Sequence, residues 1–193
     1  MGDWESFFPN IGNWEKTSEP CTDYNCIGFA AGALDQWWEP FPEDGLGYYW
    51  PAGAARSRLL AGHVEAFRTL GYEVCEDGSL DPNKDKIVLY VNGYGHVVHA
   101  ARQLTDGKWT SKMGNFDDIA HESPDSVAGE YGTPSCFMQR VRKANEAVVS
   151  ETQASSDAET SKGVPLSDAS NSNHREDFTS LLNAAARKRE QED

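Results

Sequence analysis

Three segments in the middle of the chain constrain its fold most strongly. Residues 86–91 (KIVLYV) form a largely apolar run rich in β-branched side chains, typical of a strand that is buried on both faces. Residues 96–104 and 108–113 form two further strand-like segments around Asp106-Gly107, a strong signal for a two-residue hairpin turn. Because hairpins join antiparallel strands, the sequence predicts a central antiparallel sheet.

Two helices are predicted before this sheet. The first begins at Cys26 and ends between Leu34 and Trp38. The second covers residues 54–70, in which apolar residues recur every three or four positions and Gly71 can cap the end. The fold class that follows is α+β, with N-terminal helices packed on the antiparallel sheet.

The remaining segments are assigned from composition and alternation. Residues 1–20 are expected to form an irregular arm that lays aromatic side chains against the domain, and residues 72–75 and 135–140 are expected to be short strands. Residues 115–121 are expected to leave the sheet.

A change in composition divides the chain. Aromatic residues are frequent from Trp4 to Phe137, after which Phe178 is the only one. We therefore expect one domain over residues 1–143 and a disordered acidic tail over residues 144–193, in which residues 175–189 could form a short helix.

The net charge of −14 argues against nucleic acid or an anionic membrane surface as a partner, since neither offers charge complementarity. The N-terminus does not have the basic and then apolar pattern of a secretory signal, and the chain has no apolar run long enough for a membrane helix. We therefore expect a cytoplasmic protein with four reduced cysteines and no cofactor. The sequence leaves the oligomeric state open.

Cys26 is the candidate nucleophile. Asp23 is expected to cap the first helix, which places Cys26 in the first helical turn. Free backbone N–H groups there favour a negative charge, so the thiol pKa is expected to be lowered and the thiolate to be the reactive species. The alternative is that Cys26 is a small buried core residue.

His99 is the candidate base, because it interrupts a strand of small and β-branched residues that would otherwise be core. A histidine of this kind combined with a cysteine at a helix start favours nucleophilic catalysis. His96 is the competing candidate. The two histidines lie three residues apart, so on a regular strand they face opposite sides, and we favour His99.

The residue that would orient the His99 ring depends on the hairpin register. With Thr105 opposite Lys108, His99 lies opposite Gly114, and Asn115 is the nearest side chain that could hold the imidazole. Three other residues remain open for this role: Asp117, Asp118 and, if the register is slipped, Ser111.

Other residues are candidates for substrate binding. The Cys26 backbone N–H is expected to contribute to an oxyanion hole, with Asn25 or Asn13 as the second donor. Three aromatic side chains could line a substrate cleft or simply pack in the core: Trp38, Tyr49 and Trp50. Arg102 and Lys112 could bind an acidic group of the substrate or be solvated.

The sequence also offers a set of possible zinc ligands, two sulfurs and two nitrogens, from Cys21, Cys26, His96 and His99. The spacing fits no common zinc-binding motif, and strand geometry directs the two histidines apart. We therefore predict no metal site.

Several short motifs together resemble an uncharacterised microbial domain family of unknown function. The motifs are NCIGFAAG at 25–32, WWEP at 37–40, YWP at 49–51, HAARQL at 99–104, WTSKMG at 109–114 and DIAH at 118–121. The resemblance covers residues 5–141 and implies no established activity.

More distantly, the order of cysteine and histidine is similar to that of papain-like peptidases, amidases and transglutaminases. This resemblance implies a papain-like fold with Cys26 as nucleophile and His99 as base. No clear motif for a third residue follows the histidine, which leaves room for a dyad.

We therefore expect a cysteine hydrolase, either a peptidase, an amidase or an acyl transferase. Its substrate would be a protein or peptide-like molecule, attacked through a thioester intermediate on Cys26. The alternative is a non-catalytic protein-interaction module on the same fold.

Overall fold

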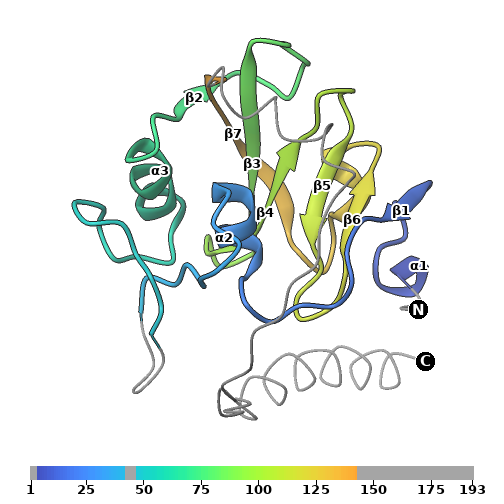
Figure 1. Cartoon of the computed structure of the whole chain (residues 1–193), viewed down its shortest axis with the longest axis horizontal. Helices are drawn as coiled ribbons and strands as arrows, with labels where there is room; N and C mark the ends of the chain where they lie inside the picture. The colour runs from blue at the N-terminus through green and yellow to red at the C-terminus, as the bar shows by residue number, and fades with distance from the viewer. Residues whose placement is uncertain (1–3, 42–46, 143–193) are drawn as a thin grey trace, which may run out of the picture. The chain divides into compact units, whose positions relative to one another are not determined.

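A seven-stranded antiparallel sheet forms the centre of the domain in the computed structural model, which describes residues 4–41 and 47–142 (Figure 1). Side by side, the strands are β1 (Trp14–Lys16), β6 (Asp118–His121), β5 (Trp109–Lys112), β4 (Val97–Gln103), β3 (Lys84–Val91), β7 (Thr133–Val141) and β2 (Glu73–Cys75). The predicted tail over 144–193, with its helix at 175–189, lies outside the described residues.

The central strands confirm the pattern expected from the sequence. In β3, five consecutive residues from Lys86 to Tyr90 are buried, as expected for a strand covered on both faces. The prediction that residues 115–121 leave the sheet is wrong for their second half. Residues Asp118–His121 form β6, which pairs with both β5 and β1.

The helices are α1 (Trp4–Phe7), α2 (Cys26–Ala31) and α3 (Leu60–Arg68), with a 3-10 turn, η1 (Pro124–Val127), between β6 and β7. The two predicted helices, α2 and α3, are shorter than expected, and the arm over residues 1–20, expected to be irregular, contains α1 and β1. Helix α2 ends at Gly32, whose φ of 83° is left-handed and stops the helix before Leu34. Helix α3 starts six residues later than expected, because the preceding segment forms turns in which the Leu59 N–H donates to Ser57 Oγ (3.1 Å).

Helices α2 and α3 cover one face of the sheet, with α2 over β4 (Figure 1). The core on this side joins Ile27 and Ala30 of α2 and Phe67 of α3 to Leu89 and Ala100 of the sheet. We call it the helical face. What holds of the expected fold class is its coarse form, a mostly antiparallel sheet with few helices.

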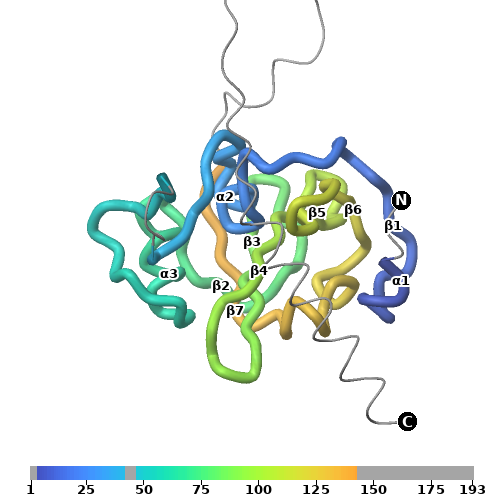
Figure 2. Tube along the Cα trace, turned by 90° about the horizontal axis from the view of Figure 1, so that it is seen from below, coloured from blue at the N-terminus to red at the C-terminus, as the bar shows by residue number. Residues whose placement is uncertain are grey.

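The N-terminal arm covers part of the other face. It runs from α1 and β1 at one edge of the sheet to α2 over its middle (Figure 2). Trp4 contacts Phe8, Phe8 contacts Tyr131, and the Tyr131 ring stacks on His99. His99 therefore points away from the helices, into an aromatic layer that we call the arm face.

Candidate functional site

Cys26 is the first residue of α2, as the sequence predicted. The predicted cap, Asp23, is wrong: Asn25 caps the helix, and its side-chain oxygen accepts a hydrogen bond from the Gly28 N–H (2.9 Å). The same oxygen accepts from the Trp38 N–H (3.1 Å), and the Asn25 amide donates to the Trp38 carbonyl (2.9 Å). Asn25 therefore links the start of α2 to Trp38, and its role as an oxyanion donor remains a prediction.

The Cys26 thiol is half-buried and hydrogen-bonds to the Val98 carbonyl of β4, with Sγ 3.9 Å from the oxygen. Burial raises the pKa of this thiol to about 11, although backbone hydrogen bonds from Ala100, Ile27 and Cys26 itself act in the opposite direction. The expectation of a lowered pKa is therefore wrong for this conformation. Near neutral pH the side chain is a thiol, and a base must remove its proton.

The thiol meets β4 where the sheet is irregular. In the β3–β4 pair, His99 lies opposite Tyr90 and Val97 opposite Val91, so Val98 is the extra residue of a β-bulge. Strand β5 pairs with β4 from Ala101 onward, so among the described strands residues 97–100 are left without a β5 partner. Cys26 therefore contacts the edge of β4, next to the backbone of His99.

His99 is completely buried on the arm face. Its ring stacks on Tyr131 with centroids 4.0 Å apart and 6° between planes, and meets Tyr90 edge-on at 5.2 Å. Its Nε2 lies 3.0 Å from Ser111 Oγ. The ring is therefore fixed in orientation by two aromatic contacts and one hydrogen bond.

Ser111, rather than Asn115, is the side chain that orients His99. The predicted hairpin register is wrong by one residue. Gln103 pairs with Trp109 and the Leu104 N–H donates to the Lys108 carbonyl (2.7 Å), so the loop contains the three residues 105–107, with Gly107 at a φ of 94°. The slip places Ser111 opposite Ala101 and hence on the same face as His99. Asn115 lies in the turn after β5.

The hydrogen bond to Ser111 continues to a second buried histidine. Ser111 Oγ lies 2.9 Å from His121 Nε2, and His121 Nδ1 lies 2.8 Å from the Ser123 carbonyl oxygen. Sequence reasoning missed His121 because it placed this segment outside the sheet. The sequence Asp118–His121 shows no alternation of apolar and polar residues, and all four residues are buried, so no simple pattern marked this strand.

The Ser123 carbonyl, at the end of this hydrogen-bonded chain, determines which nitrogen of each histidine carries a proton. The Ser123 carbonyl can only accept, so His121 carries its proton on Nδ1 and accepts from the Ser111 hydroxyl at Nε2. Ser111 Oγ must then accept from His99 Nε2–H. His99 Nδ1 is left as an unprotonated acceptor, and this buried atom has no hydrogen-bond partner among the described residues.

Both histidines are neutral near pH 7. Burial holds the pKa of His99 well below its usual range, and the nearby His121 lowers it further. Burial lowers the pKa of His121 to about 4. A hydrogen-bonded chain of two neutral rings and one hydroxyl therefore ends in the free lone pair of His99.

Cys26 and His99 lie on opposite sides of β4. Helix α2 packs on the face that carries Ala100 and Arg102, whose guanidinium lies 4.5 Å from the centre of the Phe29 ring. His99 belongs to the arm face. The thiol and the imidazole therefore lie beside the same strand. The thiol is hydrogen-bonded to the Val98 carbonyl, and the imidazole to Ser111.

The candidate cleft residues divide between the core and the surface. Trp38 and Trp50 are buried in the core of the helical face, with 3% and 6% of their surface exposed. Tyr49 is 38% exposed and packs on Trp38 with ring centres 5.0 Å apart. Of the three, Tyr49 is the one available to a ligand.

The remaining candidate polar residues are engaged in contacts of their own. Lys112 is fully buried and paired with Asp118, so it is not a solvated strand residue. Asp117 pairs with Lys16 (3.4 Å), and Asn13 donates to Glu122 at the surface (3.0 Å).

Two other findings concern the described part of the chain. It contains no group of three or more His, Cys, Asp or Glu side chains placed to hold a metal ion. None of its helices has the length and apolar character needed to cross a membrane. Separately, the four cysteines are free thiols in this structure.

Comparison with protein families identifies one match, to the family described as domain of unknown function DUF7689, over residues 15–139. Comparisons with curated proteins and with solved structures found no match. The matched region begins in β1 and ends in β7. It therefore contains Cys26 and all the residues of the hydrogen-bonded chain that leads from His99 to Ser123. The resemblance to an uncharacterised family is thereby confirmed: the chain belongs to the DUF7689 family.

Proposed function

We propose that this domain is a cysteine hydrolase or acyl transferase, with Cys26 as the nucleophile and His99 as its base. The observation that carries the proposal is the unpartnered Nδ1 of His99, a buried proton acceptor beside the strand that Cys26 contacts. Buried polar atoms are rarely left unpaired, so such an atom calls for a functional explanation.

The proposed reaction uses both nitrogens of His99. The reaction requires the thiol to leave its hydrogen bond to Val98 and to reach Nδ1 past residues 97–100 of β4, while Nε2 stays bonded to Ser111. As the thiol gives its proton to Nδ1, sulfur attacks the carbonyl carbon of an amide or thioester, the bond to the leaving group breaks, and His99 returns the proton to that group. Water, or another amine, then cleaves the thioester on Cys26.

The raised pKa of the thiol and the lowered pKa of the imidazole determine the form of this step. Neither group is charged at rest, so no ion pair is preformed, and proton transfer accompanies attack. In this respect the proposed site works like a serine–histidine pair, in which a neutral imidazole removes the proton as the nucleophile attacks. Ser111 and His121 take the orienting role that the sequence assigned to Asn115.

The relation to papain-like enzymes is part of this proposal. The order of a helix-start cysteine followed by a histidine on an antiparallel sheet supports it. By the same reasoning, the proposed substrates are proteins or peptide-like amides.

Acylation by 4-nitrophenyl acetate tests the proposal without knowledge of the natural substrate. We expect a burst of nitrophenol and an acetyl group on Cys26, detected by peptide mass mapping. In His99→Gln the burst should fall by about 100-fold, the usual contribution of a general base. Cys26→Ala should abolish it. Equal acetylation of Cys26 in the wild type and His99→Gln would reject His99 as the base.

The second candidate is a non-catalytic interaction module. It is favoured by the hydrogen bonds that hold the thiol and the imidazole apart, each on its own side of β4. In that case the wild type would show no burst, and Cys26→Ala would bind its partners as the wild type does.

A further inference from the structure

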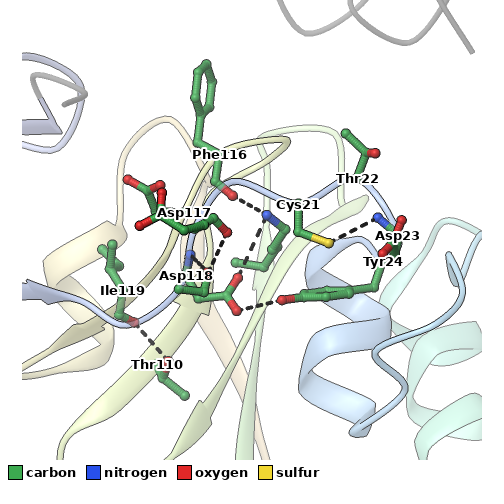
Figure 3. A network of polar contacts seen from close by, with 12 residues as sticks. Cys21, Thr22, Asp23, Tyr24, Thr110, Phe116, Asp117, Asp118 and Ile119 are labelled. Carbon is green, nitrogen blue, oxygen red and sulfur yellow. Dashed lines mark hydrogen bonds and ion pairs between the residues drawn. The ribbon is translucent and has the colours of Figure 1, made fainter. Parts of the chain in front are cut away.

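A second set of buried polar side chains lies beside the loop that leads to Cys26 (Figure 3). The Tyr24 hydroxyl donates to Asp118 Oδ2 (2.7 Å), and Lys112 Nζ lies 3.8 Å from Asp118 Oδ1. Lys112 also donates to the Phe116 carbonyl. The side chains of Lys112 and Asp118 are 0% and 8% exposed. We call Tyr24, Lys112 and Asp118 the polar anchor.

Tyr24 is held by contacts of its hydroxyl and of its ring. The hydroxyl is bound by Asp118, while the ring lies near the Lys112 ammonium, 5.4 Å from the ring centre, and stacks on Phe29 of α2 at 5.8 Å. Tyr24 immediately precedes the cap residue Asn25. Tyr24 therefore ties the residue before the α2 cap to β6.

The backbone of Asp118 binds the other end of the same loop. The Asp118 N–H donates to Ser18 Oγ (2.8 Å), and the Thr17 N–H donates to the Asp118 carbonyl (2.8 Å). One residue of β6 thus holds both ends of the segment 17–24. Few groups in the domain are as well placed to set the approach of α2 to β4.

Stability alone is a weak reason for such an arrangement. Removing a lysine and an aspartate from water costs more than most buried pairs regain, and apolar residues of similar size often stabilise a fold as well. Burial also lowers the pKa of Lys112, while Asp118 opposes that shift. A buried ion pair is better explained where it fixes a geometry.

We propose that the polar anchor positions the Cys26 thiol against the β4 edge, with Tyr24, Lys112 and Asp118 acting as positioning residues. The catalytic meaning of this position rests on the function proposed above. The position itself does not, because it concerns how the thiol is held and shielded.

Tyr24→Phe tests this inference, since it removes one hydroxyl and keeps the ring contacts with Lys112 and Phe29. We expect iodoacetamide at pH 8 to label Cys26 about tenfold faster in the variant, because one charge-assisted hydrogen bond no longer holds the loop. Peptide mass mapping reads Cys75 and Cys136 in the same sample, and their rates should not change. If Cys26 reacts through His99 as proposed above, its acetylation by 4-nitrophenyl acetate should fall, because the loosened thiol no longer keeps its place beside β4.

Thr110→Val is the matched control. Its hydroxyl donates to the Ile119 carbonyl (2.9 Å) on the same pair of strands, as Figure 3 shows. It should lower the melting temperature about as much as Tyr24→Phe and leave Cys26 labelling unchanged. Equal labelling of Cys26 in the two variants, or a rise at all cysteines together, would overturn the inference. The labelling needs no catalysis, so it tests the anchor even if no acyl-enzyme forms.

Discussion

At the scale of single residues, the most informative atom in this domain is His99 Nδ1. A ring that is buried on every side has one nitrogen satisfied by Ser111 and the other by nothing among the described residues. The difference between the two nitrogens comes from the far end of the chain, at the Ser123 carbonyl. An acceptor three hydrogen bonds away thus decides which nitrogen of His99 can take a proton.

Ser111→Ala tests how much the hydrogen-bonded chain from His99 to Ser123 contributes to the free energy of unfolding. The variant leaves His99 Nε2 and His121 Nε2 without their shared partner, so we expect a loss of about 2–4 kcal/mol in the free energy of unfolding, measured in urea. Ser135→Ala is the control, because its hydroxyl bonds to Thr133 at the surface and its loss should cost less than about 0.5 kcal/mol. Equal losses would mean that the buried chain contributes nothing special.

At the scale of elements, the sequence predicted the types of the central elements better than their ends. Buried β-branched runs identify β3 and β4 because burial on both faces leaves little room for polar residues. Element ends depend on local hydrogen bonds. Helix α2 begins where Asn25 rather than Asp23 accepts from the helix, a choice set by the tertiary contact with Trp38.

The hairpin shows how a small local difference changes a predicted site. Asp106-Gly107 was interpreted as a two-residue turn, whereas a third residue joins the loop and shifts the pairing by one. A shift of one residue moves every side chain of β5 to the other face. The sequence therefore favours Asn115 as the partner of His99 and leaves Ser111 as an alternative that needs a slipped register, which is the register observed. The bulge at Val98 could not be predicted at all.

Asn25→Ala tests the cap at the start of α2. The variant loses two accepted hydrogen bonds and one donated bond, so we expect about 2–3 kcal/mol of destabilisation in urea unfolding. Asp23→Ala, at the exposed residue first predicted to be the cap, should cost less than about 0.5 kcal/mol. A larger loss from Asp23→Ala than from Asn25→Ala would contradict the assigned cap.

At the scale of the whole domain, the sheet separates two environments. The helical face is a core of aliphatic and aromatic side chains, and the arm face holds two buried histidines among tyrosines. A third histidine, His63, is buried in α3 against Trp50. Three neutral histidines inside one small domain should make its stability depend on pH.

The domain is therefore expected to lose stability in mild acid. Burial lowers the pKa of both His63 and His121 to about 4, whereas an unfolded histidine titrates near 6.5. Because the folded pKa is the lower one, this stability is complete above about pH 6.5 and is lost as the pH falls towards 4. Each of these two histidines should contribute about 3 kcal/mol to the difference.

Urea unfolding at several pH values between 7.5 and 4 measures this effect. His63→Gln, which cannot titrate in this range, should reduce the loss by about one histidine's share relative to the wild type. An identical pH dependence in the two proteins would show that His63 is not held neutral by burial.

The proposed role of His99 as the base depends most directly on where its ring carries a proton. Long-range ¹H–¹⁵N correlation spectra of the imidazole rings measure this. At pH 7 we expect His99 to be neutral with its proton on Nε2 and a bare Nδ1, and His121 to be neutral with its proton on Nδ1. That result would leave His99 ready to accept the proton of Cys26. A proton on His99 Nδ1, or a charged ring, would contradict the assignment of His99 as the base for Cys26.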